Sequence, residues 1–320
     1  MSGSVRDVAR LLLRGREDTR VRATWRVLLA FGVFFAVLLA GSALLRRLPV
    51  PVPDVLVNAP GALPAFVGVA AVLVVSTRLL GRSAVAAYGL DVDRRWWTDA
   101  AAGVVAGCLF QALVTALTVG LGAGRIVGTL SSGFATGPLT LVVALAAAAV
   151  GFLGVALWEE LLFRAVVIHN ALEGLTDRGL GRRRAAVGAV LASVLAFGPL
   201  HALVAADGIS AAFAGVQAAV AGGYFALAYV LTDSLALPVG IHLSTNLWTT
   251  TVFGFPDSGF PALVRLQRDL GTGPEALAVV LVPAVALVGL IVAWVWLTRG
   301  TVSLGDSAGT TRGPVASEAD

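Results

Sequence analysis

Long apolar segments, separated by short polar or arginine-containing connections, recur along most of the 320-residue chain. A helix needs roughly 20 apolar residues to cross a bilayer core, and eight segments are near that length. They are residues 27–45, 61–80, 99–120, 138–158, 185–204, 211–231, 235–254 and 276–297. The pattern therefore predicts an all-α fold, a polytopic transmembrane helix bundle of about eight spans.

The composition agrees with a membrane protein. Hydrophobic residues make up 58% of the chain and charged residues only 13%, whereas soluble domains carry about 25% charged residues. The single cysteine, Cys108, excludes an internal disulfide. All 23 basic residues are arginines, and the pI is about 10.1. Because these arginines cluster between apolar spans, we expect them to orient the chain in a membrane and to bind no nucleic acid.

The arginine distribution predicts which side of the membrane each connection faces. Six arginines precede Trp25, the connections after the second and fourth spans are rich in arginine, and connection 205–210 has none. By the positive-inside rule both termini are cytoplasmic. Four arginines on the opposite side weaken the bias: Arg46, Arg47, Arg265 and Arg268.

Three regions follow from these patterns. Residues 1–24 form a basic cytoplasmic leader, residues 25–298 the transmembrane domain, and residues 299–320 a small, polar tail that we expect to be disordered. Segment 261–270, "PALVRLQRDL", is predicted as an interfacial helix outside the bilayer.

The stretch "LWEELLFRAVV" (157–167) places three charges at the end of an apolar span. Each ionisable group inside a membrane costs about 2.5–3.5 kcal/mol on the insertion scale. Glu160 and Arg164 are four apart, so they share a helix face and can pair, and a bidentate pair would let both remain charged. Glu159 points about 100° away and needs another partner.

Two later spans carry imidazole and amide groups. His201 follows Pro199, which removes a helical backbone donor, and His242 lies four residues before Asn246 on one helix face. A structural interpretation, in which these groups only hydrogen-bond helices together, stays open for each residue taken singly. Together with Glu159 they predict a polar intramembrane cavity, because one carboxylate, two imidazoles and an amide can activate water and stabilise an oxyanion.

These residues resemble the three ordered motifs of the CPBP intramembrane proteases. That family takes in the CAAX prenyl endopeptidases and the bacteriocin-processing and abortive-infection proteins. The similar region covers about residues 139–254, the expected catalytic core. The motifs read Glu159-Glu160-x-x-x-Arg164, Phe197-x-x-x-His201 and His242-x-x-x-Asn246.

The resemblance implies an intramembrane endopeptidase whose substrate is a membrane-associated peptide or a lipid-modified protein. It implies that Glu159 is the general base with His201 assisting, and that His242 and Asn246 stabilise the oxyanion. Glu160, Arg164 and Phe197 would support these groups. Ser244 lies near His242, but no GxSG-like setting for a serine nucleophile is present.

Two versions of the mechanism stay open, one with a metal ion and one without. Family members are customarily called metalloproteases, and two histidines with a carboxylate can bind zinc. A glutamate–histidine mechanism without metal fits the same residues. We slightly favour the version without metal, because no two ligands share a helix at the i, i+4 spacing of a zincin.

Two other functions compete with proteolysis. The first is a non-catalytic membrane scaffold or bacteriocin-immunity-type protein of the same fold. The second is a proton-coupled transporter, in which a Glu/His set would relay protons, although neither inverted repeats nor paired broken helices are visible. The all-arginine, alanine-rich composition favours a prokaryotic cell membrane, and nothing in the sequence indicates the oligomeric state.

Overall fold

The computed structural model describes residues 21–47, 63–80, 84–131, 133, 138–205, 210–254, 259–269 and 273–303. Nearly all of the predicted leader (1–24) and most of the predicted tail (299–320) lie outside these residues. Within them, seven helices are long and apolar enough to cross a membrane. The chain is therefore a multi-pass membrane protein, and the predicted all-α bundle of about eight spans is confirmed.

The spanning helices follow one another in an order close to the predicted one. They are α2 (Ala23–Leu45), α4 (Leu63–Val74) with the π-helix η1 (Val75–Leu80), α5 (Arg94–Gly120), α6 (Pro138–Glu159) with the π-helix η3 (Glu160–Val166) and α7 (Val167–Thr176), α8 (Arg182–Leu203), α9 (Ala211–Thr232) and α11 (Pro274–Arg299). A 3-10 turn, η2 (Val85–Tyr88), precedes α5. Predicted span 235–254 forms α10 (Ala236–Leu247) and the π-helix η4 (Trp248–Val252), which together are shorter than the other seven.

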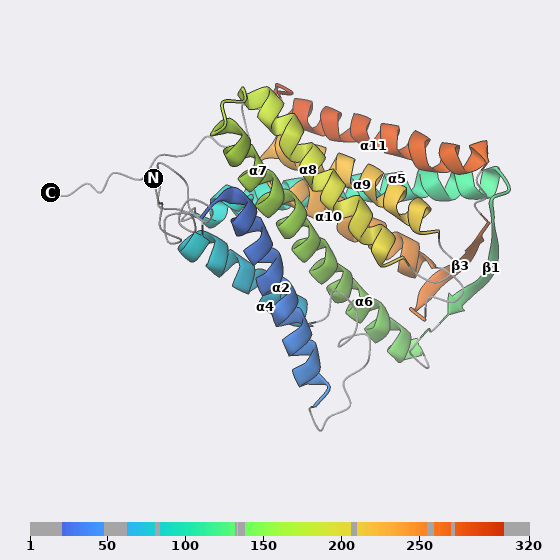
Figure 1. The fold of residues 1–320 in the computed structure, drawn as a ribbon. Helices are drawn as coiled ribbons and strands as arrows, with labels where there is room; N and C mark the ends of the chain where they lie inside the picture. Colours follow the sequence, from blue (N-terminus) through green and yellow to red (C-terminus); the bar gives the residue numbers. More distant parts are fainter. Residues whose placement is uncertain are drawn as a thin grey trace, which may run out of the picture.

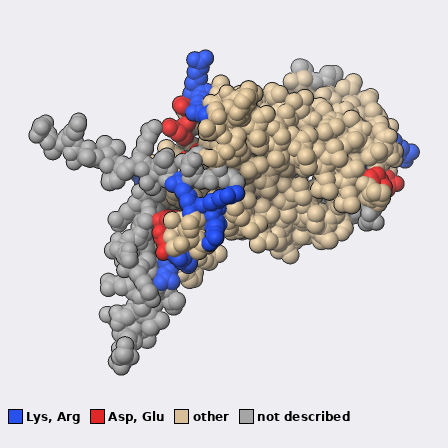
Figure 2. Space-filling model, turned by 90° about the horizontal axis from the view of Figure 1, so that it is seen from above, with Lys and Arg blue, Asp and Glu red and all other residues tan. Residues whose placement is uncertain are grey.

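The helices form one bundle with a separate pair on its flank. Figure 1 shows α2 and α4 lying side by side, next to the long run of α6 and α7, while α8 to α11 and α5 make up the rest of the bundle. Figure 2 shows arginines and acidic residues near the two ends of the molecule and an uncharged surface between them. This distribution is the one that a hydrocarbon layer around the middle of the bundle requires.

A small sheet lies beside one end of the bundle (Figure 1). Strand β1 (Gly124–Ser131) pairs antiparallel with β3 (Ala262–Arg268), and β2 (Phe253–Gly254) pairs parallel with β3. The interfacial helix predicted at 261–270 is therefore wrong. The strand is favoured because Leu266 becomes buried, and because Arg265 donates to the Ser131 hydroxyl on β1 at 2.8 Å and to the Phe260 carbonyl.

The helix of the fourth predicted span does not end with that span at residue 158. The helical run continues from Pro138 through Glu159 to Thr176, with a π-helical segment between α6 and α7. Charged residues suggested a membrane boundary, but they are buried in protein instead. Such π-helical segments insert an extra residue into a helix and occur frequently at functional sites.

Helices α5 and α10 pack with their backbones in contact. A side-chain carbon on Gly103 would meet the carbonyl of Leu237, and one on Gly240 would meet the carbonyl of Ala100. Small residues allow this close approach between membrane helices, where van der Waals packing drives association. The contact holds α5 against the helix that carries His242 and Asn246.

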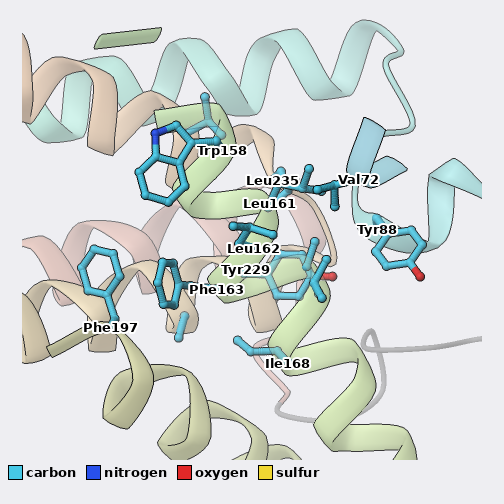
Figure 3. Packing of buried hydrophobic residues seen from close by; sticks show 14 of the residues in the cluster. Val72, Tyr88, Trp158, Leu161, Leu162, Phe163, Ile168, Phe197, Tyr229 and Leu235 are labelled. Carbon is cyan, nitrogen blue, oxygen red and sulfur yellow. The ribbon is translucent and has the colours of Figure 1, made fainter. Parts of the chain in front are cut away.

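Aromatic side chains fill the core between α2, α6 and α8. Trp158 stacks on Phe34 with ring centroids 4.7 Å apart, and Phe163 meets the edge of Phe197 at 4.9 Å. Figure 3 shows Phe163 and Phe197 side by side, with Trp158 one helical turn away. This cluster surrounds the segment that carries the two adjacent glutamates and fixes its position in the bundle.

Candidate active site

The three sequence motifs meet at the Glu159 carboxylate. Its Oε2 atom lies 3.7 Å from Nε2 of His242 and 4.0 Å from Nε2 of His201. On the predicted spans, His201 and His242 stood at different depths. They meet because Glu159 lies in the middle of the long α6–η3–α7 run and His242 lies in the middle of α10.

The second ring nitrogen of each histidine has its own partner. Nδ1 of His201 lies 3.0 Å from the Phe197 carbonyl oxygen, and Nδ1 of His242 lies 2.8 Å from Oε1 of Glu160. A carbonyl oxygen only accepts, so Nδ1 of His201 carries the hydrogen in this contact. Both Nε2 atoms are thereby directed at Glu159, in a fixed orientation.

Arg164 lies fully buried beneath this site. Its Nε atom is 3.1 Å from Oε2 of Glu160, which confirms the predicted pairing. The contact is single rather than bidentate, and within the described residues none of its side-chain nitrogens has a hydrogen-bond partner. Instead its guanidinium lies over the rings of Phe197 at 4.3 Å and Phe225 at 5.2 Å. Cation–π attraction therefore replaces part of the missing hydrogen bonding.

A cavity of about 380 Å³ opens beside the histidines. His201, His242 and Asn246 line it as predicted, and Phe197 does so too, whereas Glu159, which was also predicted to face this cavity, does not. Glu159 lies behind the two imidazoles, and its side chain is 9% exposed. Glu159 therefore faces the two histidines that line the cavity without itself forming its wall.

The structure adds two contacts that sequence reasoning missed. Glu160 was expected to pair with Arg164 alone, yet it also binds His242, 82 positions away. Phe225 stacks on the His242 ring with centroids 4.7 Å apart and an interplanar angle of 15°. No local spacing links Glu160 or Phe225 to His242, so no sequence signal could have found either contact.

Ser244 takes no part in the site as a nucleophile. Its hydroxyl donates to the backbone carbonyls of Gly240 and Ile241 on its own helix, and its side chain is buried. This placement agrees with the absence of a serine-protease motif around it.

A bound metal ion is the other way in which this set of side chains would activate water. Two imidazoles and a carboxylate are a donor set that zinc accepts. Over the described part of the chain, however, no group of three or more His, Cys, Asp or Glu side chains is arranged to hold a metal ion. The two separations from Glu159 to the histidines, 3.7 and 4.0 Å, exceed a direct hydrogen bond.

Comparison with known families agrees with the three motifs. Residues 140–248 match the family model described as type II CAAX prenyl endopeptidase Rce1-like. Comparison with curated proteins and with solved structures found no match. The matched region runs from α6 into η4 and contains every predicted site residue. The resemblance to the CAAX-type intramembrane proteases of the CPBP family is thus confirmed over residues 140–248, about a third of the chain.

Proposed function

We propose that the protein is an intramembrane endopeptidase that hydrolyses a peptide bond of a membrane-associated or lipid-modified substrate with water activated by Glu159. One observation carries this proposal: the Glu159 carboxylate faces the Nε2 atoms of two histidines from two other helices, at 3.7 and 4.0 Å. Both separations exceed a direct hydrogen bond, so the carboxylate oxygen and the two ring nitrogens keep hydrogen-bonding capacity for a water.

The reaction follows from this geometry. A water held between Glu159 and His201 attacks the carbonyl carbon of the substrate, and Glu159 accepts its proton. The resulting tetrahedral intermediate collapses when the proton passes to the leaving nitrogen and the carbon–nitrogen bond breaks. General acid–base catalysis of this kind contributes about 10²–10⁴-fold in rate.

The partners of the two histidines assign them different tasks. The carbonyl behind His201 leaves its Nε2 as an acceptor, suited to hold the attacking water. The Glu160 carboxylate behind His242 would stabilise a positively charged imidazole, which can donate from Nε2 to the oxyanion. Asn246 lies one turn further along α10 and lines the same cavity, so its amide can donate to the same oxygen.

Glu160, Arg164 and Phe197 support this machinery without reacting. Glu160 contacts both Arg164 and His242, and Phe197 lies under the Arg164 guanidinium while its carbonyl holds His201. These contacts connect the three helices, so the orientation of each histidine depends on the ion pair beneath it.

The cavity lies toward one end of the bundle, opposite the arginine-rich connections. It is lined by the C-terminal halves of α5, α8 and α10 and by the N-terminal parts of α9 and α11. If the termini are cytoplasmic, this end of the bundle faces the other side of a prokaryotic cell membrane.

Orientation can be measured with single cysteines in a Cys108→Ala background. A membrane-impermeant maleimide should label Ile126→Cys in intact cells and leave Asp91→Cys unlabelled; the reverse pattern would invert the topology.

The direct test of function compares membrane peptides in cells that carry the unmodified protein or Glu159→Gln. Peptides cleaved only by the unmodified protein identify the substrate. Equal peptide sets, together with no cleavage by the purified protein, would leave the non-catalytic scaffold as the better explanation.

Chelation separates the two versions of the mechanism. Without a resident metal, the purified protein should keep its activity in excess EDTA or phenanthroline and contain no stoichiometric zinc. One zinc per chain, with activity lost on chelation and restored by metal, would overturn this version.

A further inference from the structure

The cavity wall carries two polar side chains that the proposed reaction does not use. Gln111 on α5 and Thr245 on α10 both line the cavity. The Oε1 atom of Gln111 and the hydroxyl of Thr245 are buried, and neither has a hydrogen-bond partner within the described residues. The whole Gln111 residue is only 4% exposed. Because an unpaired buried polar group lowers stability, each is an available hydrogen-bonding group for a ligand.

A neighbouring threonine shows that Thr245 is unusual. Thr249 lies one turn further along, in η4, and lines the same cavity. Its hydroxyl donates to the backbone carbonyls of Thr245 and Asn246, at 3.0 and 3.3 Å. The hydroxyl of Thr251 likewise donates to a carbonyl one turn back, as helical threonines commonly do. The Thr245 hydroxyl makes no such bond within the described residues, so it can donate to a group in the cavity.

The packing of α5 on α10 sets the level of Gln111. A side-chain carbon on Gly107 would meet the Ser244 hydroxyl, and Trp248 donates from Nε1 to the Thr115 hydroxyl at 3.1 Å. Gln111 lies one helical turn from Gly107 and one turn from Thr115. It therefore lies opposite the stretch of α10 between Ser244 and Trp248.

Thr245 lies in this stretch, on the side of α10 toward His242. Ser244 faces α5, and Thr245 follows it about 100° round the helix. Thr245 and His242 are three positions apart, so they are neighbours on the helix surface. A group bound by both Gln111 and Thr245 would thus lie beside the His242 imidazole, which lines the same cavity.

We propose that Gln111 and Thr245 are positioning residues that bind one backbone peptide group of the substrate and so fix which bond lies at the Glu159 site. This inference rests on the proposed peptidase function. A peptide group presents one N–H donor and one carbonyl acceptor. The Gln111 Oε1 atom accepts from that N–H, and the Thr245 hydroxyl donates to that carbonyl.

The surroundings favour a backbone group as the occupant. Most of the other cavity walls are apolar, formed by side chains such as Val114, Ala218 and Val279. A substrate segment that is extended in the cavity lacks the internal hydrogen bonds of a helix, and unpaired peptide groups among apolar walls are costly. Gln111 and Thr245 supply two of the missing hydrogen bonds. Because both are neutral, they do so without selecting a charged side chain.

Backbone N-methylation tests this register, because it removes the N–H donor of one peptide group and leaves the side chains unchanged. The probe is a pool of N-acylated decapeptides of random sequence, each with one N-methylated residue at a varied position or with none. The unmodified protein cleaves the pool in detergent, and mass spectrometry reads the offset between each cut and the N-methyl group. Besides the cleaved bond itself, we expect one offset at which cleavage falls roughly 10- to 100-fold, as when a buried acceptor loses its donor.

Two variants connect that offset to the residues. Gln111→Met keeps the length of the side chain without its amide, so it should lower kcat/KM for unmethylated peptides and remove the discrimination at that offset. Its thermal unfolding midpoint should stay the same or rise, because an unpaired buried amide is removed. Thr245→Val should lower kcat/KM roughly 10-fold and keep the sensitive offset. Thr249→Val is the matched control and should keep the whole N-methyl pattern, since its hydroxyl already has backbone partners.

Two results would overturn the inference while leaving the peptidase function in place: cleavage without any such offset, or an offset that persists in Gln111→Met. If Gln111→Met lowers the unfolding midpoint, Thr245→Val decides the matter, and an unchanged kcat/KM in that variant overturns the pair. Failure of the peptidase function shows differently. The unmodified protein would then cleave no member of the pool, and the inference would fall with the function on which it rests.

Discussion

Helix α2 and the span Leu141–Thr176, which contains the segment from Trp158 to Ile168, have nearly the same peak hydropathy but differ in how much protein surrounds them. The most apolar windows of their spans have mean hydropathies of 2.5 and 2.4. Only 11% of the α2 window is buried within the protein, so most of it faces outward from the bundle. Every residue from Trp158 to Ile168 is buried, including three charged ones.

The difference shows what hydropathy does and does not report. It measures compatibility with hydrocarbon, which lipid tails and a protein core provide equally well. Charged residues distinguish the two, because they persist inside a membrane only when protein partners surround them. Under the proposed function the Trp158–Ile168 segment is the functional centre, and α2 is a flanking helix. The following substitutions test this contrast, from the largest expected effect to the smallest.

Glu159→Gln should abolish cleavage, with a loss of at least about 10²–10⁴-fold in rate. The amide keeps the size of the side chain but cannot accept the proton of water. The thermal unfolding midpoint in detergent should change little. Glu173→Gln is the matched control on the same helical run, because Glu173 pairs with Arg26 of α2, away from the cavity. Full activity of Glu159→Gln would remove this acid from the mechanism.

Arg164→Ala should lower the free energy of unfolding by about 3–5 kcal/mol, as expected when one partner of a buried ion pair is removed. Glu160 would lose its cation, and Phe197 and Phe225 would lose the guanidinium between them. Unfolding of the purified protein in detergent measures the loss. Arg26→Ala, which breaks the more exposed pair with Glu173, should cost less. Adding Glu160→Gln to Arg164→Ala should recover part of the loss; an unchanged midpoint for Arg164→Ala alone would contradict a structural role.

Leu162→Ala should destabilise the protein by about 2–5 kcal/mol, because Leu162 is fully buried and its removal leaves a cavity. Leu39→Ala on α2 removes the same atoms from a side chain that is 69% exposed. Its effect should stay within about 0.5 kcal/mol, as for surface substitutions. Equal effects on the unfolding midpoint would show that α2 is packed against something beyond the described residues.

Gly103→Ala should cost about 1–3 kcal/mol, the range for overpacking. The added carbon would meet the backbone of α10 at Leu237, which cannot move aside as a side chain can. Gly151→Ala is the control, since a carbon there meets nothing within 4 Å. Because α10 carries His242, activity should fall together with the unfolding midpoint in Gly103→Ala, and neither should fall in Gly151→Ala.

The sequence by itself determined most of the helical segments and selected the residues of the proposed site. Apolar length predicted the spans, because a membrane helix must satisfy its backbone internally and cover itself with apolar side chains. Spacing of four placed Glu160 with Arg164 on one face, and the structure confirms this pair. The three motifs selected Glu159, His201 and His242, which the fold brings together.

Only the tertiary structure decided how these parts meet. The Glu160–His242 bond, the stacking of Phe225 on that histidine and the β1–β3 pairing all join positions far apart in the chain. The contribution of Gln111 to the cavity depends in the same way on how α5 is packed. Local patterns encode helices and their faces, because those depend on neighbours along the chain. Which face meets which helix depends on side-chain packing across the bundle, and hydropathy carries no information about that choice.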